Sequence, residues 1–110
     1  MMRDRQAAMF WHLDIGQGVL VHDQISHLPD AFDVAQHIDC LREDMLQIGF
    51  GDQLLLDVGW YPSFNRKGRF LLLLVKDQEW DKPLEKARFH DVVSLKQRIA
   101  RIAGKLAYPL

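Results

Sequence analysis

The sequence QLLLDVGWYPSFNRKGRFLLLLVK, at residues 53–76, contains two apolar runs joined by a short polar connection. The runs 53–61 and 69–76 have the length of strands, and the connection 62–68 is rich in residues that form turns. Strands joined by so short a connection pair antiparallel. We therefore expect a hairpin whose two strands form the centre of a sheet.

Both faces of this hairpin are apolar, and each face needs a cover. Neighbouring residues of a strand point to opposite faces. In the run 53–61, one face carries Leu54, Leu56, Val58 and Trp60, and the other carries Leu55, Asp57, Gly59 and Tyr61. One helix can cover each face, or both helices can cover one face while a partner or a long loop covers the other.

The segment before the hairpin predicts an amphipathic helix from Asp30 to about Ile48. Asp30 follows Pro29 and suits the N-cap position, and Gly49 stands where a helix commonly ends. Apolar residues recur at spacings of three and four: Val34, Ile38, Leu41, Met45 and Ile48. Off this stripe lie four acidic residues: Asp33, Asp39, Glu43 and Asp44. The exposed face of the helix would therefore be acidic.

The segment after the hairpin predicts an edge strand and a second amphipathic helix. Residues 84–90 are rich in charge, which discourages unwanted pairing at the edge of a sheet. Asp91 suits the N-cap of a helix whose apolar stripe is Val92, Leu95, Ile99, Ile102 and Leu106. The cations of this helix lie off the stripe, at Lys96, Arg98, Arg101 and Lys105.

The N-terminal part predicts a further strand, because residues 9–15 show the alternation of a half-buried strand. Gly16 and Gly18 break this strand, and residues 19–21 fit either a short returning strand or a packed loop. Together the elements predict an α+β fold: a small, mainly antiparallel sheet in the order β-α-β-β-β-α with two amphipathic helices packed on it. A single domain over residues 1–110 accounts for them, because a chain of this length builds one core.

The composition is that of a globular protein, because 48% hydrophobic and 26% charged residues suffice for a core. The single cysteine, Cys40, excludes an internal disulfide, and the polar first residues are not followed by an apolar signal region. The longest apolar run, 70–75, is much shorter than the roughly 20 residues of a membrane-spanning helix. We expect a cytoplasmic protein without membrane contact.

Charge is divided unevenly along the chain. Residues 14–57 contain nine acidic residues against Arg42 alone, a net charge of −8. Residues 58–110 contain eleven Lys and Arg against five acidic residues, a net charge of +6. Blocks of this kind steer a charged partner, or they attract one another across the fold.

No residues have the spacing of a catalytic, metal or nucleotide site. The five histidines fall outside recognisable ligand spacings, and Gly16 and Gly18 lack the third glycine of a dinucleotide fingerprint. His12 and Asp14 would share a strand face, an arrangement more typical of a surface hydrogen bond than of an acid/base pair. The cations of the last helix fit a solvated face, since the pI is near 6.5. We expect no catalytic residues, cofactor, metal or direct nucleic-acid contact.

The segment 57–64 gathers an acid, a glycine and three aromatic residues at the end of a central strand. Trp60 fits a core residue, and Gly59 fits a position that eases close packing. Tyr61 would face the same side as Asp57. An aromatic residue beside an acid is typical of a binding hot spot for a cationic partner.

Five stretches spread over most of the chain carry a family resemblance: WHLDIG at 11–16, LREDMLQ at 41–47, DVGWYP at 57–62, GRF at 68–70 and WDKP at 80–83. In these stretches the sequence resembles the small immunity proteins that protect bacteria from toxins of contact-dependent growth inhibition and related polymorphic toxin systems. The resemblance implies a non-enzymatic inhibitor, made with its cognate toxin and bound tightly over the active site or substrate surface of the toxin. In many such pairs the toxin is a nuclease.

An acidic surface suits such an inhibitor, because a nuclease presents a basic surface to phosphates and carboxylates can occupy that surface instead. The predicted contact residues are Asp39, Glu43, Asp44, Asp57, Tyr61 and Phe64. The free protein would be a monomer, and its complex with the toxin domain would be 1:1. Two alternatives stay open: a homodimeric adaptor that uses its sheet face or edge strand, and a hydrolase that uses His12 and Asp14.

Overall fold

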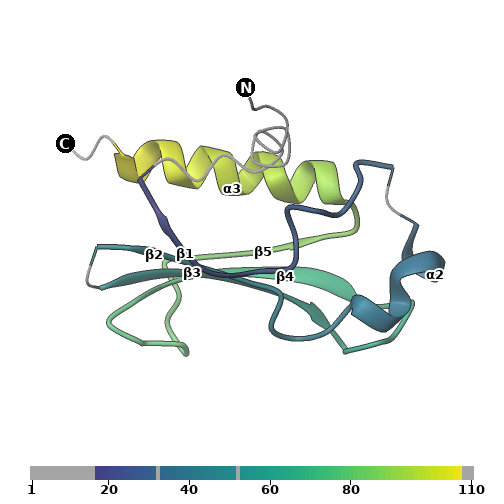
Figure 1. The fold of residues 1–110 in the computed structure, drawn as a ribbon. Coiled ribbons are helices and arrows are strands. Elements are labelled where there is room, and N and C mark those ends of the chain that lie inside the picture. The colour runs from purple at the N-terminus through teal and green to yellow at the C-terminus, as the bar shows by residue number, and fades with distance from the viewer. Residues whose placement is uncertain (1–16, 32, 52, 108–110) are drawn as a thin grey trace, which may run out of the picture.

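The predicted hairpin forms the two longest strands of a five-stranded sheet in the computed structural model (Figure 1), which describes residues 17–31, 33–51 and 53–107. The strands are β1 (Val19–Asp23), β2 (Leu46–Phe50), β3 (Leu54–Tyr61), β4 (Arg69–Lys76) and β5 (Glu85–Phe89). Each pairs antiparallel with its neighbours in the order β1-β2-β3-β4-β5. The central hairpin, the charged edge strand and the α+β class are therefore confirmed.

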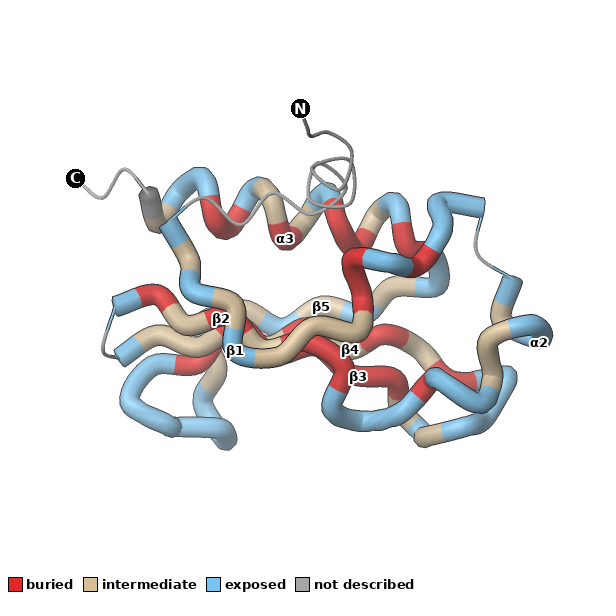
Figure 2. The backbone as a smooth tube through the Cα atoms, viewed as in Figure 1, coloured by how far each residue is buried: buried red, intermediate tan, exposed pale blue. Residues whose placement is uncertain are grey.

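One helix, α3 (Val92–Ala107), lies across one face of the sheet (Figure 1). The side chain of Asp91 caps it by accepting a hydrogen bond from the backbone N–H of Ser94 at 2.8 Å. Its apolar stripe is buried as predicted, with Leu106 only partly so: Val92, Leu95, Ile99, Ile102 and Leu106. Figure 2 shows that the buried positions of α3 face the sheet. Trp60 lies in this core, with its ring 4.9 Å from that of Phe70.

The predicted helix from Asp30 to Ile48 is wrong. These residues form a four-residue helix α2 (Val34–His37), a 3₁₀ turn η1 (Ile38–Cys40) and, after a loop, the strand β2. The N-cap of α2 is Asp33, whose carboxylate accepts a hydrogen bond from the backbone N–H of Ala35 at 2.9 Å. The order of elements in the described residues is β-α-β-β-β-β-α. Of the two predicted amphipathic helices, only α3 forms.

The helix prediction fails because the residues at 46–50 also fit a strand. Leu46, Ile48 and Phe50 are buried, and the two residues between them are half-buried, which is the two-residue period of a strand. The edge of β3 needs a partner for its backbone groups, and β2 pairs with it in register from Leu46 opposite Val58 onwards. Pairing with the sheet therefore outweighs the helical spacing of the apolar residues.

The segment 19–21, whose sequence fits either a strand or a loop, belongs to β1. Its pairing with β2 shifts register between Leu20 and His22, as at a β-bulge. Val19 and Val21 are exposed on this strand. The strand predicted at 9–15 lies outside the described residues.

Lys96 is buried, although its place off the apolar stripe predicted an exposed side chain. Its Nζ donates hydrogen bonds to the carbonyl oxygens of Leu28 at 2.8 Å and Ser26 at 3.4 Å. Burial lowers the pKa of Lys96, and the charges of Asp30 and Asp23 partly oppose this effect. The ammonium group thus ties α3 to the loop that follows β1.

Replacing Lys96 by methionine is expected to lower the free energy of unfolding by about 1 to 3 kcal/mol, because two buried carbonyl groups lose their donor. Methionine keeps most of the apolar stem volume, so packing changes little. Lys105→Met on the same helix is the matched control. Its exposed ammonium group makes one surface ion pair with Glu85 at 3.4 Å, so its loss should cost less than about 1 kcal/mol. Urea unfolding at pH 7 measures both values, and equal losses would disprove the structural role of Lys96.

Candidate functional site

The face of the sheet opposite α3, which we call the open face, has no described helix lying across it (Figure 1). Loops border it at both ends: the segments 41–45 and 62–68 at one end, and the loop 77–84 at the other (Figure 1). Half-buried apolar side chains occupy its centre: Leu55, Leu71 and Leu73. The open face therefore combines accessible apolar surface with flanking loops.

On the open face, Asp57 and the cations of β5 lie on different strands, and a further cation, Arg69 on β4, pairs with Tyr61. One row of paired positions runs from β2 to β5 through Gln47, Asp57, Leu73 and Lys86, and a neighbouring row runs through Gly59, Leu71 and Arg88. The cations of these rows lie on the edge strand β5. The acid lies on β3, next to the segment that leads into β2.

Residues 43 and 44 form a bulge between two backbone hydrogen bonds. The N–H of Met45 donates to the carbonyl of Val58 at 3.0 Å, and the N–H of Trp60 donates to the carbonyl of Arg42 at 2.8 Å. The two residues between these bonds have no place in the ladder and loop out from it.

The bulge folds over the open face at Gly59. A Cβ atom on Gly59 would overlap the carbonyl group of Glu43, so only glycine leaves room for the bulge. The Tyr61 hydroxyl donates a hydrogen bond to the carbonyl oxygen of Glu43 at 3.4 Å, and Nε2 of His22 lies 3.0 Å from the carbonyl oxygen of Asp44. The close packing predicted at Gly59 is confirmed, and the group that packs there is the backbone of Glu43.

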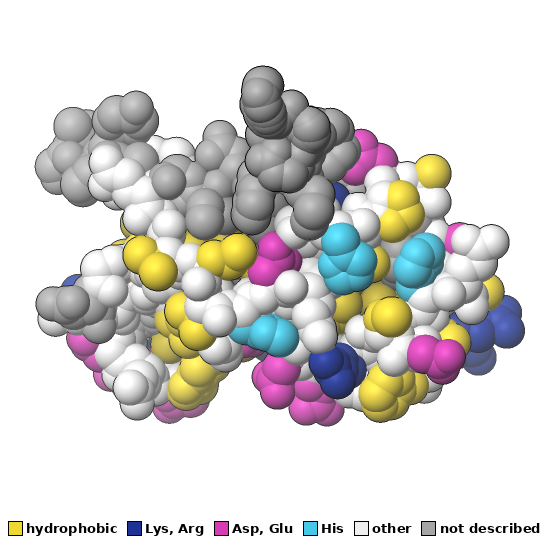
Figure 3. Space-filling model, in the orientation of Figure 1, with side chains coloured by type: hydrophobic (Ala, Val, Ile, Leu, Met, Phe, Trp, Pro, Cys, Tyr) yellow, Lys and Arg dark blue, Asp and Glu magenta, His cyan; other side chains and the backbone are white. Residues whose placement is uncertain are grey.

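The bulge brings together four of the predicted contact residues, which we call the acidic cluster: Glu43, Asp44, Asp57 and Tyr61. Partial burial and the charges of Asp57, Glu43 and Asp44 raise the pKa of the Tyr61 hydroxyl. Burial and, less strongly, the charge of Asp44 raise the pKa of Asp57, against the effect of a hydrogen bond from Gln47 at 3.1 Å. Figure 3 shows acidic side chains along the side of the molecule away from α3, and others elsewhere on the visible face.

The acidic cluster has a cation beside it across the strands, Arg69, which pairs with Tyr61 but donates from its guanidinium group to the carbonyl oxygens of Lys67 and Gly68, both at 2.9 Å. In residues 17–107, apart from 32 and 52, no lysine or arginine forms an ion pair with the three carboxylates of the cluster. Arg42 is next to Glu43 in the chain, but its Nε donates to Oε1 of Gln24 at 3.1 Å. Basic residues of α3 pair elsewhere, since Arg98 and Lys105 both contact Glu85.

Asp39 is not among the charges that act on Tyr61 or Asp57. It lies exposed on η1, because the helix that would have aligned it with Glu43 and Asp44 does not form. There it lines a separate small hollow with Gln24, His27, Cys40 and Arg42. Asp39 is therefore not part of the acidic cluster.

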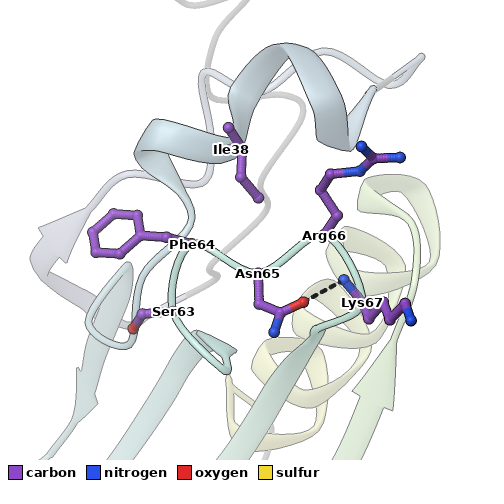
Figure 4. Close-up of a pocket in the computed structure, with 6 residues that line it drawn as sticks. All are labelled: Ile38, Ser63, Phe64, Asn65, Arg66 and Lys67. Carbon is purple, nitrogen blue, oxygen red and sulfur yellow. Dashed lines mark hydrogen bonds between the residues drawn. The ribbon is translucent and has the colours of Figure 1, made fainter.

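Phe64 is 57% exposed on the connection between β3 and β4. It lines a wide, open hollow of about 830 Å³ with Ile38, Ser63, Asn65, Arg66 and Lys67 (Figure 4). Its backbone N–H donates to the carbonyl of Leu41 at 2.6 Å, which joins this connection to the segment that carries the bulge. Phe64 therefore lies next to the acidic cluster along the backbone, although it is not part of it.

Comparison with known proteins gives no relative. No family model, curated protein or solved structure matches the chain. The resemblance to immunity proteins therefore stays a prediction, and the candidate site depends on its geometry. In the described part of the chain, no group of three or more His, Cys, Asp or Glu residues could hold a metal ion, and no helix is long and apolar enough to cross a membrane.

Gln47 is the member of this site that sequence reasoning missed. Its side-chain N–H donates to Oδ1 of Asp57 and holds the carboxylate in place on the open face. The predicted helix assigned Gln47 no partner on β3. The alternation at 46–50 was the signal that could have placed Gln47 opposite Asp57.

Proposed function

We propose that this protein is a non-catalytic inhibitor that binds a cognate bacterial toxin, a nuclease with a basic surface, and covers its active site or the adjoining substrate surface. The observation that best supports this proposal is the acidic cluster on the open face. Its carboxylates form no ion pair with any lysine or arginine in the described residues. The resemblance to immunity proteins points to the same class of partner.

The partner follows from charge complementarity. A nuclease holds nucleic acid with Lys and Arg side chains that neutralise phosphates, and the carboxylates of the acidic cluster can take the place of those phosphates. Close charge pairs across some interfaces are strongly coupled, although each charge loses its water on binding. Tyr61 adds an aromatic ring of the kind that dominates binding hot spots, and Leu55, Leu71 and Leu73 supply apolar contact around the charges.

The carboxylate of Asp57 works against the folding of the protein. Asp57 is only 5% exposed, and burial raises its pKa. The ionised carboxylate is therefore less favourable in the folded chain than in the unfolded chain. An asparagine would accept the same hydrogen bond from Gln47 without carrying a charge. A cationic partner would favour the ionised form of Asp57 in the complex, which supports the proposal.

We expect Asp57→Asn to raise the free energy of unfolding at pH 7 while it weakens binding to the toxin. In the wild-type protein, the raised pKa of Asp57 contributes stability that is complete below pH 3.8 and is lost as pH rises through the pKa of the folded state. The advantage of the variant should therefore appear at neutral pH and vanish below pH 3.8. Urea unfolding at both pH values, with binding at pH 7, measures the two effects. A variant less stable than wild type at pH 7 would refute this assignment.

The function itself is tested with the gene next to this one. Under this proposal, the gene immediately upstream encodes a large secreted protein whose C-terminal domain is toxic. Expression of that domain should stop bacterial growth, and co-expression of this protein should restore it. A neighbouring toxin that still kills cells containing this protein, or no such neighbour, would speak against immunity.

The second candidate, a homodimeric adaptor, is favoured by one observation. Val19 and Val21 are 67% and 63% exposed on β1, which is an edge strand of the described sheet. Exposed apolar residues at an edge can pair two copies of a chain. Light scattering of the purified protein distinguishes the two functions: we expect a monomer that forms a 1:1 complex with the toxin, whereas a stable dimer without affinity for the toxin would favour the adaptor.

A further inference from the structure

Phe64 combines two unfavourable features at one residue. The residue is more than half exposed to water, and its backbone has a φ of 56°, in the left-handed region that a bulky side chain rarely adopts. Such a conformation persists only where the surrounding structure holds it. Neither feature helps the protein to fold, so both need another explanation.

The connection 62–68 holds Phe64 through a dense set of hydrogen bonds. The carbonyl of Asn65 accepts from the indole N–H of Trp60 at 2.7 Å and from the N–H of Gly68 at 2.9 Å. Its side chain accepts from the N–H of Lys67 at 2.8 Å (Figure 4). Because Trp60 is a core residue, this loop is anchored directly to the core.

The same loop is attached to the acidic cluster. The N–H of Phe64 donates to the carbonyl of Leu41, and Tyr61 at the start of the loop contacts the carbonyl of Glu43. The position of Phe64 is therefore fixed relative to the bulge. Figure 4 shows the ring of Phe64 extending to one side of the loop, and Lys67 extending to the other. Arg66 and Lys67 line the same hollow as Phe64, and Figure 4 shows both cations on the side of the loop away from its ring. A basic partner would therefore approach Phe64 from the side of the ring.

We propose that Phe64 is the apolar anchor of the interface, held ready by the connection 62–68, and that it inserts into an apolar socket beside the basic surface of the toxin. This inference rests on the proposed function. A residue already fixed in its binding conformation loses little entropy on binding, and this raises affinity without new contacts. The strain at Phe64 is then part of a preorganised binding site.

The anchor and the acidic cluster have different kinetic roles. Charges near the rim of an interface act mainly on the association rate, whereas a buried aromatic anchor acts mainly on the dissociation rate. Loss of Phe64 should therefore leave encounter with the toxin intact and shorten the lifetime of the complex. Loss of the carboxylates should slow encounter.

The test measures binding kinetics of this protein to the C-terminal toxic domain encoded upstream, with the toxin immobilised for biolayer interferometry. Phe64→Ala is expected to speed dissociation about 30-fold or more, with the association rate within about threefold of wild type. Phe64→Leu, which keeps an apolar side chain, should restore part of the lifetime. Val93→Ala is the control, because Val93 is an exposed apolar residue on α3 and not on the open face. Thermal unfolding verifies that all variants are folded.

The outcomes separate this inference from the function on which it rests. One outcome is that wild type binds, the variants of the acidic cluster associate slowly, and Phe64→Ala dissociates like Val93→Ala. The assignment of Phe64 as the apolar anchor is then wrong, and the proposed function stands. If wild type does not bind the toxin, both proposals fail. Fast dissociation of Phe64→Ala, with a dissociation rate of Val93→Ala equal to that of wild type, supports both the anchor and the proposed function.

Discussion

Replacing Gly59 by alanine is expected to destabilise the protein by about 3 kcal/mol or more. The added Cβ would overlap the carbonyl group of Glu43, and this obstacle is backbone that cannot turn aside as a flexible side chain can. The bulge would have to leave the open face, which breaks the hydrogen bond between Trp60 and Arg42. Urea unfolding at neutral pH measures the loss.

Gly49→Ala is the matched control for this substitution. Gly49 lies on β2, on the same open face, and no atom lies within 4 Å of the Cβ it would gain. Alanine there should change the free energy of unfolding by less than about 1 kcal/mol, in the stabilising direction, because glycine weakens a strand interior. Equal effects of the two substitutions would show that the bulge does not pack on Gly59.

Neutralising the acidic cluster is expected to slow association with the toxin at least about tenfold, and about 100-fold at low salt. The variant combines Glu43→Gln, Asp44→Asn and Asp57→Asn, which keep side-chain size and remove three negative charges. Because the carboxylates act by steering, the association rate of wild type should fall steeply with added salt, and that of the variant should fall less.

A second triple variant controls for net charge. Asp77→Asn, Glu79→Gln and Asp81→Asn remove the same charge from the loop 77–84, at the other end of the open face. If the position of the charges matters, this variant should associate within about threefold of wild type. Equal slowing by both triple variants would mean that total charge, not the acidic cluster, drives association.

The hairpin and α3 could be predicted from the sequence because their signals are local. The runs at 53–61 and 69–76 lie next to each other in the chain, and Asp91 with a regular apolar stripe defines a helix without help from other segments. The segment 30–48 could not be predicted, because its apolar spacing fits a helix and part of it also fits a strand. The strand forms because β3 has backbone groups that must pair with a neighbouring strand. Such pairing is a property of the assembled sheet and not of the local sequence.

The candidate site was predicted in part, and partly for the wrong reason. Asp57 and Tyr61 share a face by strand alternation, as the sequence indicated. Glu43 and Asp44 join them because the backbone bulges between two ladder bonds, not because a helix presents them. Asp39 was expected beside them only as part of that helix. A bulge depends on the register between two strands, which no local pattern reveals.

The most direct test of the central claim is to map the surface that the toxin covers. Backbone amide NMR signals of the labelled protein would be compared with and without the unlabelled toxic domain. We expect the largest changes in the segment 41–45 and at residues 57–64, with little change on the outer face of α3. Changes confined to α3, with the open face unaltered, would contradict the account.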